Sequence, residues 1–150
     1  MTSLLHVIND SSQSRGGAQK VLAELNFIES SHLGLDVKVF SKNRIEDEVS
    51  GVQVVGGKWW VLSLLSLIFK FRPDIVVIHS RMFLPFVYFL RLLNCRVIYY
   101  CHARYRRFPW VFKLFPCNQY VAVSESVSSY LSVYIPANKI YVNYNPIERQ

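Results

Sequence analysis

The stretch LLHVINDSSQSRGGAQKVLAEL, residues 4–25, decides the fold that we expect for the whole chain. Its first five residues are largely apolar and predict a short buried strand, and a polar loop follows them. After Gly16 and Gly17, apolar residues recur at helical spacing. Paired glycines let a backbone approach a ligand closely, and the helix N-terminus behind them attracts anions. A tight turn without any ligand has the same pattern, and the spacing matches neither G-x-G-x-x-G nor a P-loop. Both interpretations stay open at this point.

Length and composition predict a single domain with a sizeable core. The chain has 150 residues, of which 51% are hydrophobic and 15% aromatic, and this composition excludes a disordered protein. The formal net charge is +7. Excess positive charge favours an anionic partner, such as a phosphorylated substrate, an acidic lipid surface or nucleic acid. A plain basic surface has the same charge, so charge alone does not choose between these alternatives.

The three cysteines predict neither a disulfide framework nor a zinc site. Cys95, Cys101 and Cys117 are odd in number and lack C-x-x-C spacing. Two of them lie in or beside apolar runs, where buried free thiols are common. The N-terminus lacks the basic and apolar regions of a signal peptide. Together these features favour a reducing cytoplasm.

Two segments are very apolar, at residues 59–71 and 82–93. Each is shorter than the roughly 18 apolar residues of a membrane-spanning helix. Polar residues interrupt the first segment, and Pro85 and Arg91 mark the second. We expect helices buried against a sheet, with contact at a membrane interface as the alternative.

Strands and helices alternate along the sequence, which predicts an α/β fold with a mostly parallel sheet. After the first strand and helix, the predicted strands are residues 36–40, 51–55, 75–79, 96–101, 119–123 and 139–142. The predicted helices are residues 59–71, 83–93 and 125–134, with a helical turn at 111–115. In such sheets ligands bind outside the carboxyl ends of the strands. The loops expected there are residues 9–17, 79–81, 102–110 and 124–125.

The loop at residues 102–110 interleaves basic and aromatic side chains, namely Arg104, Arg106, Arg107, Tyr105, Phe108 and Trp110. Arginines suit two-pronged contacts with phosphate, so the loop suits an anionic acceptor. It also suits an acidic membrane, with the exposed aromatic rings entering the interface. A solvated loop is the third interpretation. Nucleic-acid binding ranks lowest, because no recognised nucleic-acid motif accompanies these residues.

Four segments together resemble the N-terminal domain of the family-4, GT-B-fold glycosyltransferases. In order they are LLHVIND…RGGAQKVLAEL, PDIVVIHS, VIYYCHA and QYVAVSESVSSYL…IPANKIYVNYNPIE. The resemblance implies a Rossmann-like three-layer α/β/α sandwich with a mostly parallel sheet, which is one half of a GT-B fold. Residues 1–150 are then a single acceptor-side domain. The C-terminal donor-binding domain, with its acidic motif, is expected to be absent from the chain.

The resemblance also implies site residues. The R-G-G-A loop places Arg15, Gly16 and Gly17 against the donor diphosphate or the transferred sugar. His102 matches the family's histidine after a buried strand and takes a positioning and electrostatic role in catalysis. The donor or acceptor is further contacted by His79, Ser124 and Glu125, together with Arg81 and Arg104 from the basic segments. Family members often carry a second histidine at the position of Arg81.

The expected function is the acceptor side of a retaining glycosyltransferase, which moves a sugar from a nucleotide-diphosphate sugar to a glycan or lipid-linked acceptor. The donor half is required in cis or in trans, and we expect neither a metal nor another cofactor. The alternative is a non-catalytic scaffold subunit that recruits a donor-binding chain to the inner face of the membrane. A different Rossmann-type nucleotide-binding protein is a third hypothesis, against which the missing G-x-G-x-x-G counts.

Overall fold

The computed structural model describes residues 1–9, 21–22, 25, 28–29, 31–43 and 52–144. It divides into two compact units, Met1–Val76 and Val77–Gln150, and each is described by itself. The boundary falls within strand β4, Ile75–Ile78. No helix in the described part of the chain is both long and apolar enough to cross a bilayer.

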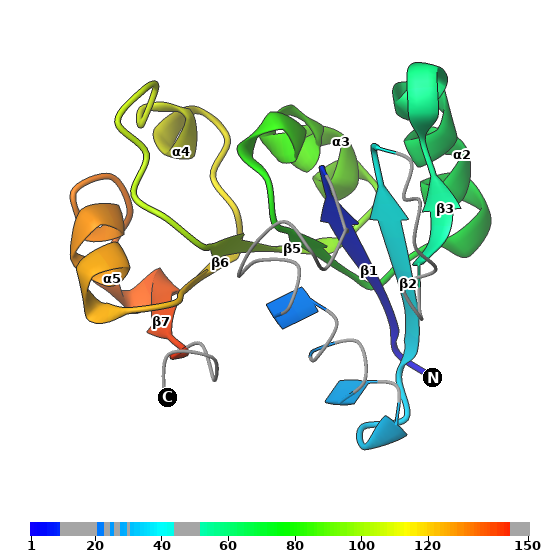
Figure 1. The fold of residues 1–150 in the computed structure, drawn as a ribbon, viewed down its shortest axis with the longest axis horizontal. Coiled ribbons are helices and arrows are strands. Elements are labelled where there is room, and N and C mark those ends of the chain that lie inside the picture. The colour runs from blue at the N-terminus through cyan, green and yellow to red at the C-terminus, as the bar shows by residue number, and fades with distance from the viewer. Residues whose placement is uncertain (10–20, 23–24, 26–27, 30, 44–51, 145–150) are drawn as a thin grey trace. The chain divides into compact units, whose positions relative to one another are not determined.

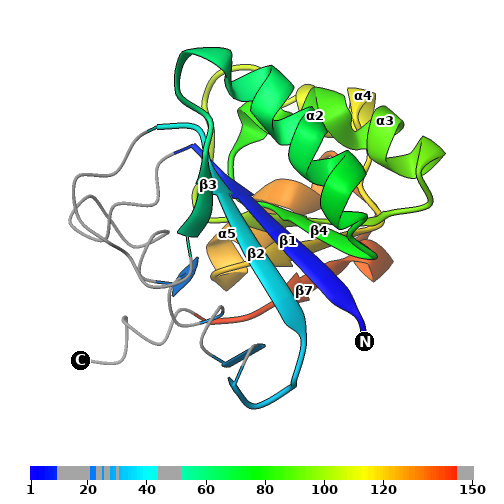
Figure 2. The same ribbon diagram turned by 90° about the vertical axis from the view of Figure 1, so that its right-hand side faces the viewer.

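The first unit is built on three parallel strands. β1 (Ser3–Ile8) pairs with β2 (Asp36–Ser41), which pairs with β3 (Val52–Val55), and Figure 2 shows β1 and β2 side by side. The 3-10 helix η2 (Gly57–Trp59) then leads into helix α2 (Trp60–Phe71). The predicted strands and the helix at residues 59–71 are thus confirmed. His6 on β1 is fully buried and lies 2.6 Å from the Glu29 carboxylate, so it has a structural role.

Gly56 and Gly57 form a turn, and each position requires glycine for a different reason. Gly57 has a φ of +58°, which favours a residue without Cβ. Gly56 has an ordinary φ, but a Cβ built there would lie 2.5 Å from the Cβ of Trp60 and 2.8 Å from the Phe40 ring. The pair therefore fixes the close approach of η2 and α2 to β2.

Gly56→Ala is expected to destabilise the protein by about 1–3 kcal/mol, because the added methyl group overpacks a closed site. The measurement is the free energy of unfolding in urea. Gly34→Ala is the comparison for backbone strain alone, since Gly34, unlike Gly56, has a positive φ of +63° and open space around its Cβ position. An unchanged stability of the Gly56 variant would show that Trp60 and Phe40 move aside freely.

The second unit carries three further parallel strands and the helices between them (Figure 1). β5 (Arg96–Cys101) pairs with β6 (Gln119–Ala122), which pairs with β7 (Ile140–Val142). The connecting elements are η3 (Arg81–Phe86), α3 (Val87–Leu92), α4 (Val111–Leu114), α5 (Glu125–Ser132) and η4 (Ala137–Lys139). Every strand pair described within a unit is parallel, and helices alternate with strands. The predicted α/β, Rossmann-like fold is confirmed.

One predicted helix differs from the structure. Residues 83–93 were expected to form one helix, but residues 81–86 form the 3-10 helix η3 and only Val87–Leu92 is α-helical. Pro85 lies inside η3. A proline has no N–H and its ring clashes with the preceding turn of an α-helix, so the α-helix begins only after it.

Aromatic rings fill the core of the second unit. Tyr99 on β5 and Tyr120 on β6 are fully buried, and Phe112 of α4 meets the Tyr99 ring edge-on at 5.2 Å. The three cysteines are buried free thiols, as predicted. Burial raises the pKa of Cys101 and of Cys117 to about 12, so both thiols stay protonated and weakly reactive.

Candidate functional site

The polar side chains predicted at strand ends gather in the second unit. The predicted His102 follows β5 and the predicted Ser124 follows β6, and Asn143, which was not predicted, follows β7. The register pairs Cys101 with Ala122 and Ala122 with Val142, so these three strands end at the same level. His79 follows β4 and joins this edge through a direct contact with His102. The carboxyl ends of parallel strands thus deliver the candidate site, as the sequence predicted.

The centre of the site is a hydrogen-bonded pair of histidines. Nδ1 of His79 lies 3.0 Å from Nε2 of His102, and the two rings stack with centroids 5.3 Å apart. His79 is only 3% exposed. A hydrogen bond between two imidazole nitrogens needs one N–H and one bare nitrogen, so only one of the two facing nitrogens carries a hydrogen.

His102 is neutral at physiological pH. Burial lowers its pKa to about 4, because the surroundings of the ring disfavour the charged form. A neutral imidazole offers one N–H donor and one acceptor nitrogen. One nitrogen faces His79, which leaves the other for a ligand. The ring can therefore orient a hydroxyl or accept its proton, but it supplies a dipole and not a full positive charge.

Two residues that sequence reasoning missed complete this cluster. The Tyr100 ring stacks on His102 at 4.9 Å and on His79 at 5.5 Å between centroids. Nδ2 of Asn143 donates a hydrogen bond of 3.2 Å to the Tyr100 hydroxyl. Side chains two apart on a strand share a face, so the position of Tyr100 beside His102 was readable from the sequence. The Asn143 contact spans 43 residues, and no local pattern signals it.

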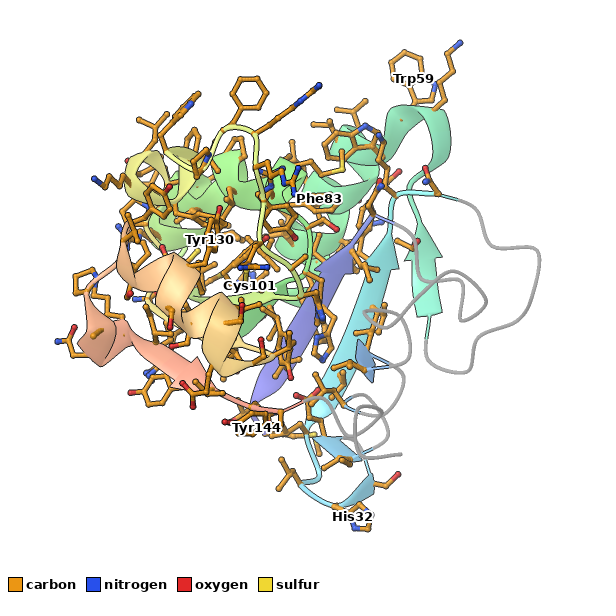
Figure 3. All side chains as sticks on the ribbon, turned by 60° about the vertical axis from the view of Figure 1, so that its left-hand side comes forward. His32, Trp59, Phe83, Cys101, Tyr130 and Tyr144 are labelled. Atoms are coloured by element: carbon orange, nitrogen blue, oxygen red, sulfur yellow. The ribbon has the colours of Figure 1, made fainter. Side chains whose placement is uncertain are left out.

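Ser124 and Glu125 lie at the start of α5 and both have partners within the protein. Oγ of Ser124 accepts a hydrogen bond of 3.3 Å from the Val127 amide, which is the N-cap expected from the sequence. The Tyr144 hydroxyl donates to Oε1 of Glu125 at 3.0 Å, and Figure 3 labels Tyr144. The hydrogen bond and the negative charge of Glu125 both raise the pKa of Tyr144.

Arg81 contacts the loop at residues 102–110 and holds it in place. Its guanidinium carbon lies 3.8 Å from the centre of the Tyr105 ring, and its Nη1 donates a hydrogen bond to the Arg107 carbonyl at 2.5 Å. These contacts give the arginine a structural role. The sequence pattern did not reveal this role, because the partners lie 24 and 26 residues further along the chain.

A pocket of about 540 Å³ lies between this loop and α5, and Arg104, Tyr105, Arg106 and Tyr130 line it. Figure 3 labels Tyr130 on α5. The Tyr130 hydroxyl donates a hydrogen bond of 3.1 Å to the Tyr105 carbonyl, and the Tyr99 hydroxyl lies 3.4 Å from the Tyr105 hydroxyl. Tyr105 is thus fixed from several sides. The volume suits a small ligand, and the two arginines favour an anion.

The structure brings His79 and His102 together and places Arg104 in the neighbouring pocket. Arg81 instead binds the loop at residues 102–110, and Ser124 caps helix α5. The predicted residues Arg15, Gly16 and Gly17 lie outside the described residues.

Comparison with known proteins agrees with this architecture. No curated protein matches the chain. The sequence model of Glycosyltransferase Family 4 matches residues 33–150, which is more than two thirds of the chain and includes β2 to β7 and the histidine pair. The chain therefore belongs to Glycosyltransferase Family 4.

Proposed function

We propose that this chain is the acceptor-side half of a retaining glycosyltransferase that moves a sugar from a nucleotide-diphosphate sugar to a glycan or lipid-linked acceptor. The observation that carries the proposal is the stacked and hydrogen-bonded pair of His79 and His102 beside Tyr100 at the strand ends. A buried, rigid imidazole holds a reacting hydroxyl in one orientation, which is the main contribution a positioning group makes to transfer.

Within this proposal His102 touches the acceptor hydroxyl or the transferred sugar, and His79 acts as a positioning residue through it. The neutral state of His102 suits an acceptor hydroxyl, which is itself uncharged before the reaction. The chain's own residues bind and orient the substrates, and the proposal requires neither a metal ion nor another cofactor. Arg15, Gly16 and Gly17 are proposed to contact the donor diphosphate.

The neighbouring pocket gives the acceptor its proposed chemistry. Arg104 and Arg106 supply two guanidinium groups, and the rings of Tyr105 and Tyr130 supply apolar walls. Guanidinium groups pair with phosphate oxygens, and aromatic rings pack against the apolar faces of sugars. We therefore propose that the acceptor carries a phosphate or another anionic group next to its sugar. Ser124 and Glu125, at the start of α5, are proposed to contact the same substrate.

The donor half of the site is proposed to come from a further domain, either in the same protein or in a partner chain. The test is to isolate the native product from its source cell, to measure its intact mass and to assay it with labelled nucleotide-diphosphate sugars. A product of about twice the 17.5 kDa of this chain, with sugar-transfer activity, would support a two-domain enzyme. A two-domain product without transfer to any glycan or lipid-linked acceptor would count against the proposal.

The second candidate is a non-catalytic scaffold subunit that recruits a separate donor-binding chain at the membrane surface. The exposed arginines and aromatic rings of residues 102–110 favour it. A native mass of 17.5 kDa, together with a co-purifying donor-binding chain, would favour this candidate over the two-domain enzyme. We propose a cytoplasmic location for either form, because the three cysteines are free and buried.

A further inference from the structure

The net positive charge of the protein is confined to one third of the chain. Residues 75–124 contain seven of the 17 basic residues and none of the 10 acidic residues, whereas the remaining residues contain ten of each. The charge of +7 is therefore the charge of this segment alone. Its basic residues are Arg81, Arg91, Arg96, Arg104, Arg106, Arg107 and Lys113. A segment of one sign, uninterrupted by carboxylates, produces a local positive potential.

The same segment exposes large apolar side chains next to one another. Phe108 is 62% exposed and Trp110 is 53% exposed, and their rings meet edge-on at 6.2 Å. Trp110 is the N-cap of α4, and the exposed Leu114 lies four residues further on, one helical turn away. The half-exposed Tyr88 of α3 donates its hydroxyl hydrogen to the Leu114 carbonyl. We call these four side chains and the neighbouring Arg106, Arg107 and Lys113 the aromatic-basic surface.

The backbone at the tip of this surface is strained in a way that projects Phe108. Its φ is +54°, which a bulky residue rarely adopts. Such a conformation is energetically unfavourable and persists only where the surrounding structure holds it. Arg81 holds the residues that precede Phe108, because it donates a hydrogen bond to the Arg107 carbonyl and packs on Tyr105. The protein thus maintains a strained loop that holds an aromatic ring in solvent.

We propose that the aromatic-basic surface docks the protein on an anionic lipid bilayer. Aromatic side chains such as Trp110 and Phe108 suit the boundary between headgroups and acyl chains. Each arginine or lysine beside an acidic bilayer strengthens binding by about fivefold. The exposed side chain of Leu114 has no group that could form a hydrogen bond with a nucleic acid, but it fits the apolar part of a bilayer. The proposal deepens the membrane role named for the second candidate function, and vesicle binding is measured without any sugar-transfer assay, so the two proposals can fail separately.

The test is co-sedimentation of the purified chain with phosphatidylcholine vesicles, with and without about one third phosphatidylglycerol. We expect binding to the anionic vesicles only, and we expect it to weaken as salt screens the charges. Trp110→Ser should weaken binding about tenfold or more, because a membrane-interface ring is lost. Trp59→Ser is the matched control. Trp59, on the 3-10 helix η2 (Figure 3), is an exposed tryptophan like Trp110, but it lies outside the basic segment.

A second pair of variants tests the charge separately from folding of the loop. Arg106→Gln combined with Arg107→Gln should weaken binding about thirtyfold, since two cations leave the surface. Lys58→Gln combined with Lys70→Gln removes the same charge at exposed positions outside the segment and should change binding little. Equal binding to neutral vesicles, or equal losses in both pairs, would overturn the proposal. Retention on duplex DNA without vesicle binding would also overturn it and would assign the surface to nucleic acid.

Discussion

Replacing His102 with alanine is expected to lower the turnover number of the protein that holds both halves by about 10²–10³-fold, without loss of folding. The imidazole is mostly buried, stacks on Tyr100 and presents one nitrogen that His79 does not use. Loss of this group leaves the acceptor hydroxyl without its proposed partner. Steady-state rates of sugar transfer measure the effect, and far-UV circular dichroism reports whether the variant is folded.

The exposed His32 provides the matched control, because His32→Ala removes an imidazole far along the sequence from the cluster. Turnover of that variant should stay at the unmodified level. His79→Gln is expected to fall between the two, since a glutamine retains a hydrogen-bonding group but not the ring stack with His102. A His102→Ala variant that turns over normally would remove His102 from the proposed mechanism and would leave only a structural role for the cluster.

The sequence predicted the elements well where local patterns are decisive. The apolar run IVVI and the largely apolar segment RVIYYC form β4 and β5, and Ser124 is the N-cap of α5. The helix expected over residues 83–93 was shortened by Pro85, whose effect on the preceding turn outweighed the apolar pattern. Local periodicity thus predicts which elements exist better than where they begin.

The candidate site was predictable as a place and not as a set of contacts. Parallel strands bring their carboxyl ends together, and this topology placed His79 near His102 in advance. The stack with Tyr100, the bond from Asn143 and the use of Arg81 as a loop support depend on side-chain packing between distant segments. Packing of this kind leaves no periodic signal in the sequence, so only the structure reveals it.

Acidification is expected to destabilise the protein between about pH 6.5 and pH 4 through His102. Burial holds the pKa of His102 near 4 in the folded protein, whereas an unfolded histidine titrates near its ordinary value of 6.5. Between pH 6.5 and pH 4, His102 therefore binds a proton in the unfolded chain but not in the folded protein. The contribution of His102 to stability is complete above about 6.5 and falls as the pH approaches 4.

The shift corresponds to at most about 3 kcal/mol, at 1.36 kcal/mol for each pKa unit. The measurement is the free energy of unfolding in urea at pH 7 and at pH 4.5, for the unmodified chain and for His102→Gln. We expect the variant to lose less stability on acidification, because its amide does not titrate. Asp74 does not interfere in this window, since two hydrogen bonds from Ser3 lower its pKa below its usual 3.8.

Parallel pH profiles for the unmodified chain and the His102 variant would mean that the folded protein binds the proton at His102. The neutral imidazole proposed for the acceptor hydroxyl would then be wrong.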